Sequence, residues 1–217
     1  MNVKDKNVVI YGASGHGKVI ADIVDKSGKK VLAFVDDNEN LQDKSFCGYP
    51  VWGGGSYLIE QTKKQAFSVI IGVGDNNKRQ QIQQELDAAG FCFGTAIHPA
   101  AQLGNDVTIG PGTVVMANSV INPGTRVGNH CIVNTAVSID HDCIIGDFVH
   151  LSPGAHLGGG VQVGHSSWIG LGASIINNIY IAEHTIIGAG SVVIRNVDAY
   201  TVVAGNPAAF LRKNTKK

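Results

Sequence analysis

The feature that most constrains the fold of this chain is an aliphatic residue that recurs every six positions through its second half. From Ile97 to Val193, every sixth residue is Leu, Ile or Val without exception. Neither an α-helix nor an ordinary β-strand has this period, whereas a fixed short repeat indicates a solenoid and a hexapeptide repeat indicates a parallel β-helix. The sequence therefore predicts a prism in which each hexad supplies one short strand and one corner.

Two further positions of the hexad indicate how the corners are built. A small or β-branched residue stands four places after each aliphatic residue, and Gly often follows the aliphatic residue directly. We expect the aliphatic side chain to point inward beside the small residue, and Gly or Asn to adopt the positive φ of the corner, which other residues resist. Three hexads make one triangular coil, so residues eighteen positions apart are expected to stack on the same face.

The composition limits the partners and the compartment of this chain. Its 217 residues carry 17 basic and 17 acidic side chains, which leaves no electrostatic footprint for nucleic acid. The sequence shows neither a signal-peptide pattern nor an apolar run long enough to span a bilayer. The four cysteines lack metal-ligand spacing. We therefore expect a cytoplasmic protein with reduced thiols that binds neither nucleic acid nor membrane.

The chain before the repeat predicts a small α/β domain. Strands are expected at 7–12, 30–35 and 67–73, with helices from the Gly-rich turn to about Lys26 and over roughly 77–89. Alternating strands and helices indicate a parallel sheet. The predicted organisation is thus a Rossmann-like α/β domain over 1–96, an all-β parallel β-helix over 97–198, and a C-terminal tail over 199–217.

Each predicted strand of the first domain ends in residues suited to a ligand. The turn Gly12-Ala13-Ser14-Gly15-His16-Gly17 follows the first strand, Asp36-Asp37 the second, and Gly74-Asp75-Asn76 the third. Ligands of such sheets bind at the carboxyl ends of the strands, where a helix N-terminus favours a phosphate. The turn lacks G-x-G-x-x-G spacing and, taken alone, is more typical of an ordinary connection. The three clusters together leave a nucleotide site and plain turn chemistry evenly supported.

The histidines are the candidates for chemistry within the repeat. None of the eight occupies an inward position, so those of the prism are expected at corners or on outer faces, where a solvated side chain is the ordinary outcome. His141 differs because Asp140 and Asp142 flank it, and neighbouring carboxylates raise the basicity of an imidazole. This pattern suits a general base at neutral pH, although charged corner residues often only face water.

These motifs resemble one bacterial family. The Gly-rich turn, Asp36-Asp37, the segment 72–76 and above all the segment 139–155 are similar to sugar acetyltransferases that N-acetylate UDP-4-amino-4,6-dideoxy-N-acetyl sugars, on the bacillosamine and related glycan pathways. The sialic acid O-acetyltransferases are closely related to that family. The resemblance covers essentially the whole chain. It implies a left-handed β-helix, a homotrimer, acetyl-CoA as co-substrate without a metal, and a UDP-amino-sugar as acceptor.

The resemblance also implies roles for particular residues. His141 matches the family's general base and Asp142 the acidic residue that raises its pKa, while Asn134 matches a polar residue near the acceptor amine. Positions that match the acetyl-CoA groove are His150, Gly159, Leu171 and Ala189. Positions that match the UDP-sugar site are Ser14, Gly15, His16, Asp36, Asp37 and Gly74. In this scheme the amine attacks the thioester directly and a backbone N–H near it, at Gly159, stabilises the oxyanion.

Three other functions stay open at this point. The same base would serve a sugar hydroxyl, as in the sialic acid O-acetyltransferases. A zinc hydrolyase of the carbonic anhydrase type shares the left-handed β-helix but needs three His ligands, and its pair of histidines five residues apart does not occur here. A non-catalytic nucleotide-sugar binding module would leave His141 and Asp142 as ordinary corner residues.

The end of the sequence carries a basic cluster, formed by Arg212, Lys213, Lys216 and Lys217. Such residues are able to meet the phosphate groups of CoA. A solvated terminus is nevertheless the expected state of this segment.

Overall fold

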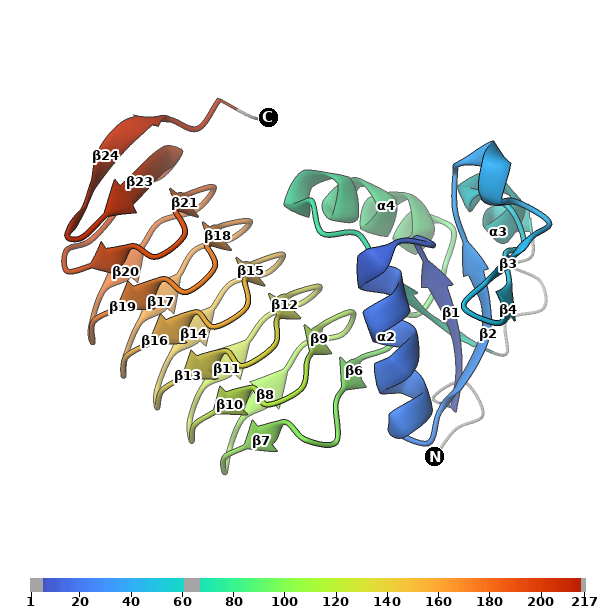
Figure 1. Cartoon of the computed structure of the whole chain (residues 1–217), viewed down its shortest axis with the longest axis horizontal. Coiled ribbons are helices and arrows are strands. Elements are labelled where there is room, and N and C mark those ends of the chain that lie inside the picture. The colour runs from blue at the N-terminus through green and yellow to red at the C-terminus, as the bar shows by residue number, and fades with distance from the viewer. Residues whose placement is uncertain (1–5, 61–66, 216–217) are drawn as a thin grey trace. The chain divides into compact units, whose positions relative to one another are not determined.

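The computed structural model describes residues 6–60 and 67–215, which fall into two compact units, 1–99 and 100–217 (Figure 1). The first unit is built on a parallel sheet with the strand order β2-β1-β5. Its strands are β1 (Asn7–Tyr11), β2 (Lys30–Val35) and β5 (Ser68–Ile71), and its longer helices are α2 (Gly15–Lys26) and α4 (Asn76–Ala88). Every residue of β5 is buried, as in a parallel sheet covered on both faces. The predicted α/β fold is confirmed.

The segment between β2 and β5 contains elements that the alternating pattern did not predict. They are the 3₁₀ helix η1 (Glu39–Leu41), β3 (Ser45–Phe46), β4 (Tyr49–Pro50) and α3 (Gly55–Glu60). Cys47 and Gly48, both with positive φ, form the turn between the two strands. Each strand is only two residues long and Cys replaces the usual Asn or Asp of such a turn, so the sequence carried no hairpin signal.

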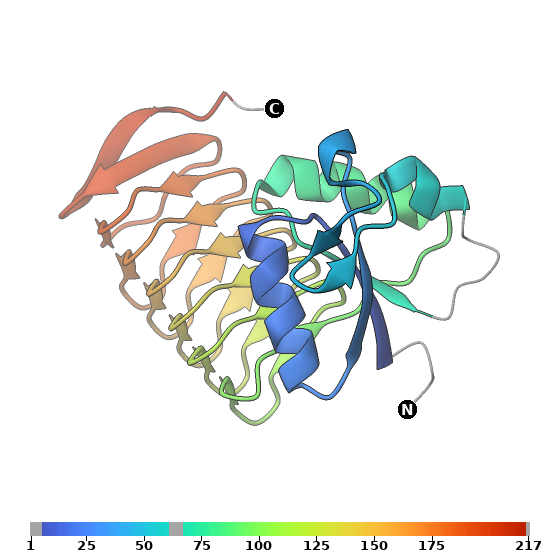
Figure 2. The same ribbon diagram turned by 45° about the vertical axis from the view of Figure 1, so that its right-hand side comes forward.

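The second unit is a parallel β-solenoid whose strands form three sheets (Figures 1 and 2). The first sheet contains β7 (Gln102–Leu103), β10 (Val120–Ile121), β13 (Ser138–Ile139), β16 (His156–Leu157), β19 (Ser174–Ile175) and β22 (Val192–Val193). The second contains β8 (Thr108–Ile109), β11 (Arg126–Val127), β14 (Ile144–Ile145), β17 (Gln162–Val163) and β20 (Tyr180–Ile181). The third contains β9 (Val114–Val115), β12 (Ile132–Val133), β15 (His150–Leu151), β18 (Trp168–Ile169), β21 (Ile186–Ile187), β23 (Thr201–Gly205) and β24 (Ala208–Lys213). The short strand β6 (Ala96–Ile97) belongs to the end of the first unit.

The register of the solenoid is eighteen residues per coil, as the hexads predict. Val120 pairs with Ser138, and Ser138 with His156, in parallel. Every repeat aliphatic residue from Val115 to Val193 is buried, so the predicted inward row forms the core of the solenoid. The first coil is the exception, because Leu103 is 42% exposed.

The corners correct the prediction for the glycines. Positive φ occurs at the third residue after each aliphatic residue from Leu103 to Ile187, and this place is taken not only by Gly and Asn but also by His130, Asp142 and Phe148. The Gly that follows the aliphatic residue directly is needed for a different reason. A Cβ on Gly146 would lie 2.9 Å from the backbone nitrogen of His165, so glycine here allows successive coils to stack closely.

The predicted C-terminal tail also differs from the structure. β23 pairs in parallel with β21 and antiparallel with β24, so residues 201–213 form a hairpin that continues the third sheet. Arg212 and Lys213 lie on β24 with exposed side chains, instead of in a solvated terminus. Lys216 and Lys217 lie outside the described residues.

Candidate active site

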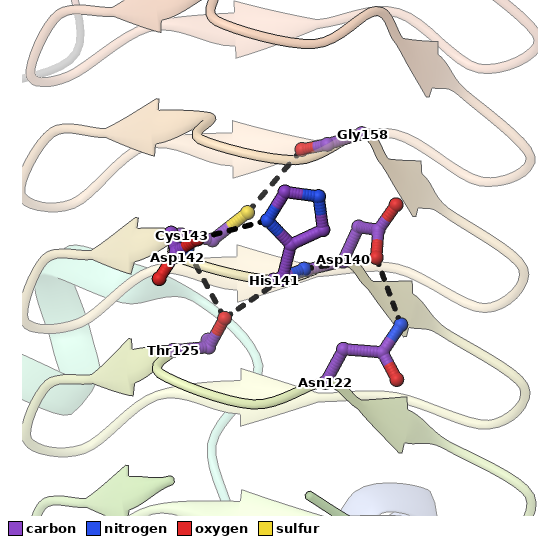
Figure 3. Close-up of polar contacts among 7 residues, drawn as sticks. All are labelled: Asn122, Thr125, Asp140, His141, Asp142, Cys143 and Gly158. Carbon is purple, nitrogen blue, oxygen red and sulfur yellow. Dashed lines mark hydrogen bonds and ion pairs between the residues drawn. The ribbon is translucent and has the colours of Figure 1, made fainter. Parts of the chain in front are cut away.

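The corner between β13 and β14 carries the histidine that the sequence singled out. The Nδ1 atom of His141 lies 2.9 Å from Oδ2 of Asp142, and the two side chains are 61% and 74% exposed (Figure 3). Asp142 has a φ of 57°, which is the left-handed conformation of the corner. A carboxylate only accepts hydrogen bonds, so the neutral imidazole carries its proton on Nδ1 and keeps a free lone pair on Nε2.

The charges at this corner favour a basic imidazole. The hydrogen bond that His141 donates to Asp142, followed by the negative charge of Asp140, raises the pKa of His141 above its ordinary value. The backbone N–H of His141 and the side-chain amide of Asn122 both donate to Oδ1 of Asp140, at 2.9 Å each. These bonds lower the pKa of Asp140, which therefore stays ionised beside the base.

The imidazole ring of His141 lies against Gly159, on the next coil. A Cβ added to Gly159 would be 2.6 Å from Nε2 of His141. The carbonyl of Gly159 accepts the N–H of Asn178, whereas its own N–H donates to no residue within 6–60 or 67–215. His141 and Gly159 line a hollow of about 510 Å³ together with Asn177 and Asn178. The lone pair on Nε2 of His141 and the unused N–H of Gly159 thus belong to neighbouring residues. Acyl transfer requires one group to accept a proton and another to stabilise the oxyanion.

A second hollow lies at another edge of the solenoid and is mostly apolar. It has a volume of about 500 Å³, and its lining includes Asn134, His150, Trp168, Leu171 and Ala189. The rings of His150 and Trp168 stack with centroids 5.0 Å apart and an angle of 12°. We call this hollow the apolar groove. The sequence analysis missed Trp168, although its place eighteen residues after His150 put it on the same face.

Polar contacts anchor the stacked rings of the apolar groove. Trp168 Nε1 donates to Oγ of Ser152 at 2.8 Å, and Asn134 Nδ2 lies 3.4 Å from Nε2 of His150. His150 is buried, whereas Leu171 is 59% exposed. The groove therefore combines an ordered aromatic wall with an open apolar rim, which suits a long and partly apolar ligand.

The structure divides the predicted acetyl-CoA residues between two edges of the solenoid. Gly159 lies with His141 on the edge between the first and second sheets. His150, Leu171 and Ala189 lie with Asn134 in the apolar groove, where the third sheet meets the first. The described part of one chain therefore does not bring all the predicted residues of the acetyl-transfer site into a single hollow.

In the first unit, the two aspartates at the end of β2 hold neighbouring loops. Asp36 Oδ2 accepts the N–H of Ala13 in the Gly-rich turn at 2.7 Å. Asp37 accepts the hydroxyl of Tyr11 at 2.8 Å and the N–H of Gly55 at 2.9 Å. Burial, followed by the bond to Asp37, raises the pKa of Tyr11. Both carboxylates thus shape the carboxyl edge of the sheet.

The glycines at this edge fall into two kinds. Gly12 and Gly17 are required by packing, because a Cβ on Gly17 would overlap the carbonyl of Gly12. Gly15 and Gly74 have no such reason, since a Cβ on either would meet nothing within 4 Å. Bare backbone at these two positions allows a ligand to approach closely. The other predicted residues of this edge are Ser14, which is exposed and lies 3.4 Å from the carbonyl oxygen of Gly72, and His16, which is half-buried.

The third edge of the solenoid corrects the expectation of solvated histidines. His130 is only 3% exposed and stacks on Phe148, with centroids 5.2 Å apart and an angle of 8°. The column continues through His165 and His184 to Tyr200. Burial, followed by the charge of His184, lowers the pKa of His165. These rings pack the edge.

Within 6–60 and 67–215, no group of three or more His, Cys, Asp or Glu side chains is arranged to hold a metal ion. In the same ranges, no helix has both the length and the apolar character to cross a membrane.

The sequence and the fold of this chain are similar to those of known sugar-modifying enzymes. Residues 7–86 match the family described as the PglD N-terminal domain. The UDP-N-acetylbacillosamine N-acetyltransferase of Bacillus subtilis is 39% identical over 116 residues, which are 52% of this chain and 52% of that protein. This chain therefore spans about half the length of that curated relative.

Two solved structures cover nearly the whole chain. The acetyltransferase domain of PglB from Neisseria gonorrhoeae is 37% identical and superposes with a TM-score of 0.87 over 95% of this chain and 100% of that one. PerB from Caulobacter crescentus, solved in complex with CoA and GDP-perosamine, is 36% identical with a TM-score of 0.89 over 95% and 97%.

Proposed function

Since the chain belongs to the hexapeptide-repeat sugar N-acetyltransferases, the family of the PglB domain and PerB, we propose that it acetylates the amino group of a nucleotide-linked amino sugar with acetyl-CoA. The more specific proposal is the 4-amino group of a UDP-4-amino-4,6-dideoxy-N-acetyl-hexosamine. The name of the Bacillus relative supports the sugar and the nucleotide. The PglB domain has been solved in complex with acetyl coenzyme A, which supports the donor.

The observation that carries the proposal is the geometry around His141. Its Nδ1 is engaged by Asp142 at 2.9 Å, and its Nε2 lies over Gly159. In the proposed reaction, Nε2 takes a proton from the acceptor amine, and the amine nitrogen forms a bond to the thioester carbonyl carbon. The N–H of Gly159 stabilises the oxyanion. The C–S bond then breaks, and the CoA thiolate takes the proton from His141.

Direct attack is favoured over a covalent acyl-enzyme by the position of the nearest thiol. Cys143 is 0% exposed, and its Sγ lies inside the solenoid, where it donates to the carbonyl of Gly158 at 3.3 Å. Burial raises the pKa of Cys143, so it is held as the neutral thiol, whereas a nucleophilic cysteine needs an accessible thiolate.

The test of this function is thiol release from acetyl-CoA with three acceptors. We expect rapid release with a UDP-4-amino-4,6-dideoxy sugar, and little or none with GDP-perosamine or free sialic acid. Release with GDP-perosamine alone would keep the N-acetyltransferase activity but replace the nucleotide. Release with sialic acid alone would assign the chain to the O-acetyltransferases, and silence with all three would contradict the proposal.

We further propose that the active site forms between copies of this chain in a homotrimer. The support is the division of the site residues, because His141 and Gly159 lie on one edge while His150, Leu171 and Ala189 line the groove of another. Side-by-side solenoids related by a closed rotation would place the first edge of one copy against the apolar groove of the next. Acetyl-CoA would then lie in the groove with its thioester near the partner's base.

Mixing two inactive variants tests this arrangement. His141→Asn removes the base, and Ala189→Trp fills the groove, so each homotrimer is expected to be inactive. Co-expression in equal amounts is expected to restore about a quarter of wild-type turnover. Subunits assemble at random, and a site is active only where the intact base edge of one subunit meets the intact groove of the next. A mixture that stays inactive, although mass measurement shows mixed trimers, would place both residues in a site within one chain.

A further inference from the structure

The corner that carries His141 is tied at both ends to a single hydroxyl group. The Oγ1 of Thr125 donates a hydrogen bond to the carbonyl oxygen of Asp140 at 2.8 Å and accepts one from the backbone N–H of Cys143 at 3.1 Å. His141 and Asp142 are the two residues between those ends (Figure 3). One side chain on the preceding coil thus contacts the loop with the proposed base both where it begins and where it ends. It acts together with backbone bonds from the N–H of Asp142 to the carbonyl of Pro123 and from the N–H of Gly160 to the carbonyl of His141.

Thr125 is suited to this task by its position inside the solenoid. Its side chain is 0% exposed, so water does not compete for either hydrogen bond. Its β-branched side chain also has few rotamers. The chain of contacts continues upward, since Cys143 Sγ donates to the carbonyl of Gly158, the residue before Gly159. The coils that carry Thr125, His141 and Gly159 are therefore linked from within.

The exposed contacts of the base cannot replace this internal link. The bond to Asp142 fixes the imidazole only relative to its own sequence neighbour, and both side chains are more than half exposed. A general base has to lie within hydrogen-bond reach of the proton that it takes, and small displacements of such groups are costly. We propose that Thr125 is a positioning residue that holds Nε2 of His141 over Gly159. This inference rests on the proposed function of His141.

The chain contains a matched control for this inference at another edge. Thr113 Oγ1 donates to the carbonyl of Gly128 at 2.7 Å and accepts the N–H of Cys131 at 2.9 Å, and Thr113 is also 0% exposed. The corner that it fixes carries Asn129 and His130, which belong to neither hollow. Thr113→Val therefore removes the same two hydrogen bonds from an equally buried site without touching the proposed base.

The experiment compares Thr125→Val with Thr113→Val. Both variants leave a buried carbonyl and a buried N–H without their partner, so the Tm of each is expected to fall by a similar amount. Only Thr125→Val is expected to lower kcat, by about 10-fold to 100-fold, with the KM for acetyl-CoA nearly unchanged. The acidic limb of its kcat profile is expected to move to lower pH, because a loosened corner weakens the bond to Asp142. Thr125→Ser, which keeps the hydroxyl, is expected to restore kcat and the pH profile.

Two further variants guard against misfolding of Thr125→Val and against a wrong assignment of the base. If Thr125→Val does not fold, Thr125→Cys takes its place, because Cys131 and Cys143 already occupy the same position of the hexad. The thiol is a weaker hydrogen-bond donor and acceptor than the hydroxyl, so Thr125→Cys is expected to lower kcat, but less than Val would. Equal kcat in the two Val variants, full turnover in Thr125→Cys, or no rescue by Thr125→Ser would each overturn the inference. Measuring His141→Asn in parallel separates the two proposals, since undiminished turnover of that variant would refute the function of His141 itself.

Discussion

Replacement of His141 by Asn is expected to lower turnover about 10²-fold to 10⁴-fold, because the acceptor amine then loses its general base. The side chain is 61% exposed, so the Tm should stay close to that of the unaltered protein. Groove residues that are proposed to bind acetyl-CoA lie on another edge, so the KM for acetyl-CoA should change little. Initial rates of thiol release, measured with both substrates saturating, give the loss in kcat.

The neighbouring carboxylate supplies the control for this prediction. Asp142→Asn keeps the imidazole but exchanges a charged acceptor for a neutral one, so a smaller loss of kcat is expected than for His141→Asn. The hydrogen bond to Asp142 raises the pKa of His141, and removing the charge should shift the acidic limb of kcat/KM to lower pH. Turnover of His141→Asn close to that of the wild type would show that another group removes the proton.

The substitution Gly159→Ala is expected to lower turnover about 10²-fold through displacement of the base. The added methyl group would lie 2.6 Å from Nε2 of His141, which is closer than van der Waals contact allows. The imidazole is the end of an exposed side chain and moves aside more readily than the backbone of a coil. The solenoid should therefore remain folded, with an unchanged Tm, while Nε2 leaves the place where it meets the amine.

A double-mutant cycle distinguishes this mechanism from a direct loss at Gly159. In the His141→Asn background, Gly159→Ala is expected to cause little further loss, because the group that it displaces is already absent. Independent, additive losses would show that the methyl group acts on the oxyanion or on acetyl-CoA instead. Full activity of the single variant Gly159→Ala would contradict the close approach of the ring.

The periodic part of the fold was predictable because each coil contacts chiefly its neighbours. The aliphatic row from Val115 to Val193 is buried as expected, since one rule repeats with each hexad. The hairpin of β3 and β4 was not predictable, because two-residue strands joined by Cys47 and Gly48 carry no periodicity. His130 is buried for a reason that a single hexad does not contain: its ring stacks on Phe148, one coil away.

In the candidate site too, some features follow from the local sequence and others depend on how the coils stack. The pairing of His141 with Asp142 follows from adjacency in the sequence, and the structure places Nδ1 and Oδ2 at hydrogen-bonding distance. The division of the site between two edges depends on position within the eighteen-residue coil. His141 and Gly159 share one position of the coil, whereas His150 and Trp168 share another. The eighteen-residue stacking expected from the hexads, when applied to these residues, assigns the two pairs to different edges.

The reversal of chain direction at β24 has a consequence for how the protein behaves at high concentration. A stack of parallel coils has an open rim of unpaired backbone groups, on which a coil of another molecule could continue the ladder. In the third sheet, β24 runs antiparallel to β23 and occupies that rim, and it carries Arg212 and Lys213. Charged residues on an edge strand disfavour further pairing. We therefore expect the hairpin to disfavour pairing with a strand of another molecule at this end of the third sheet.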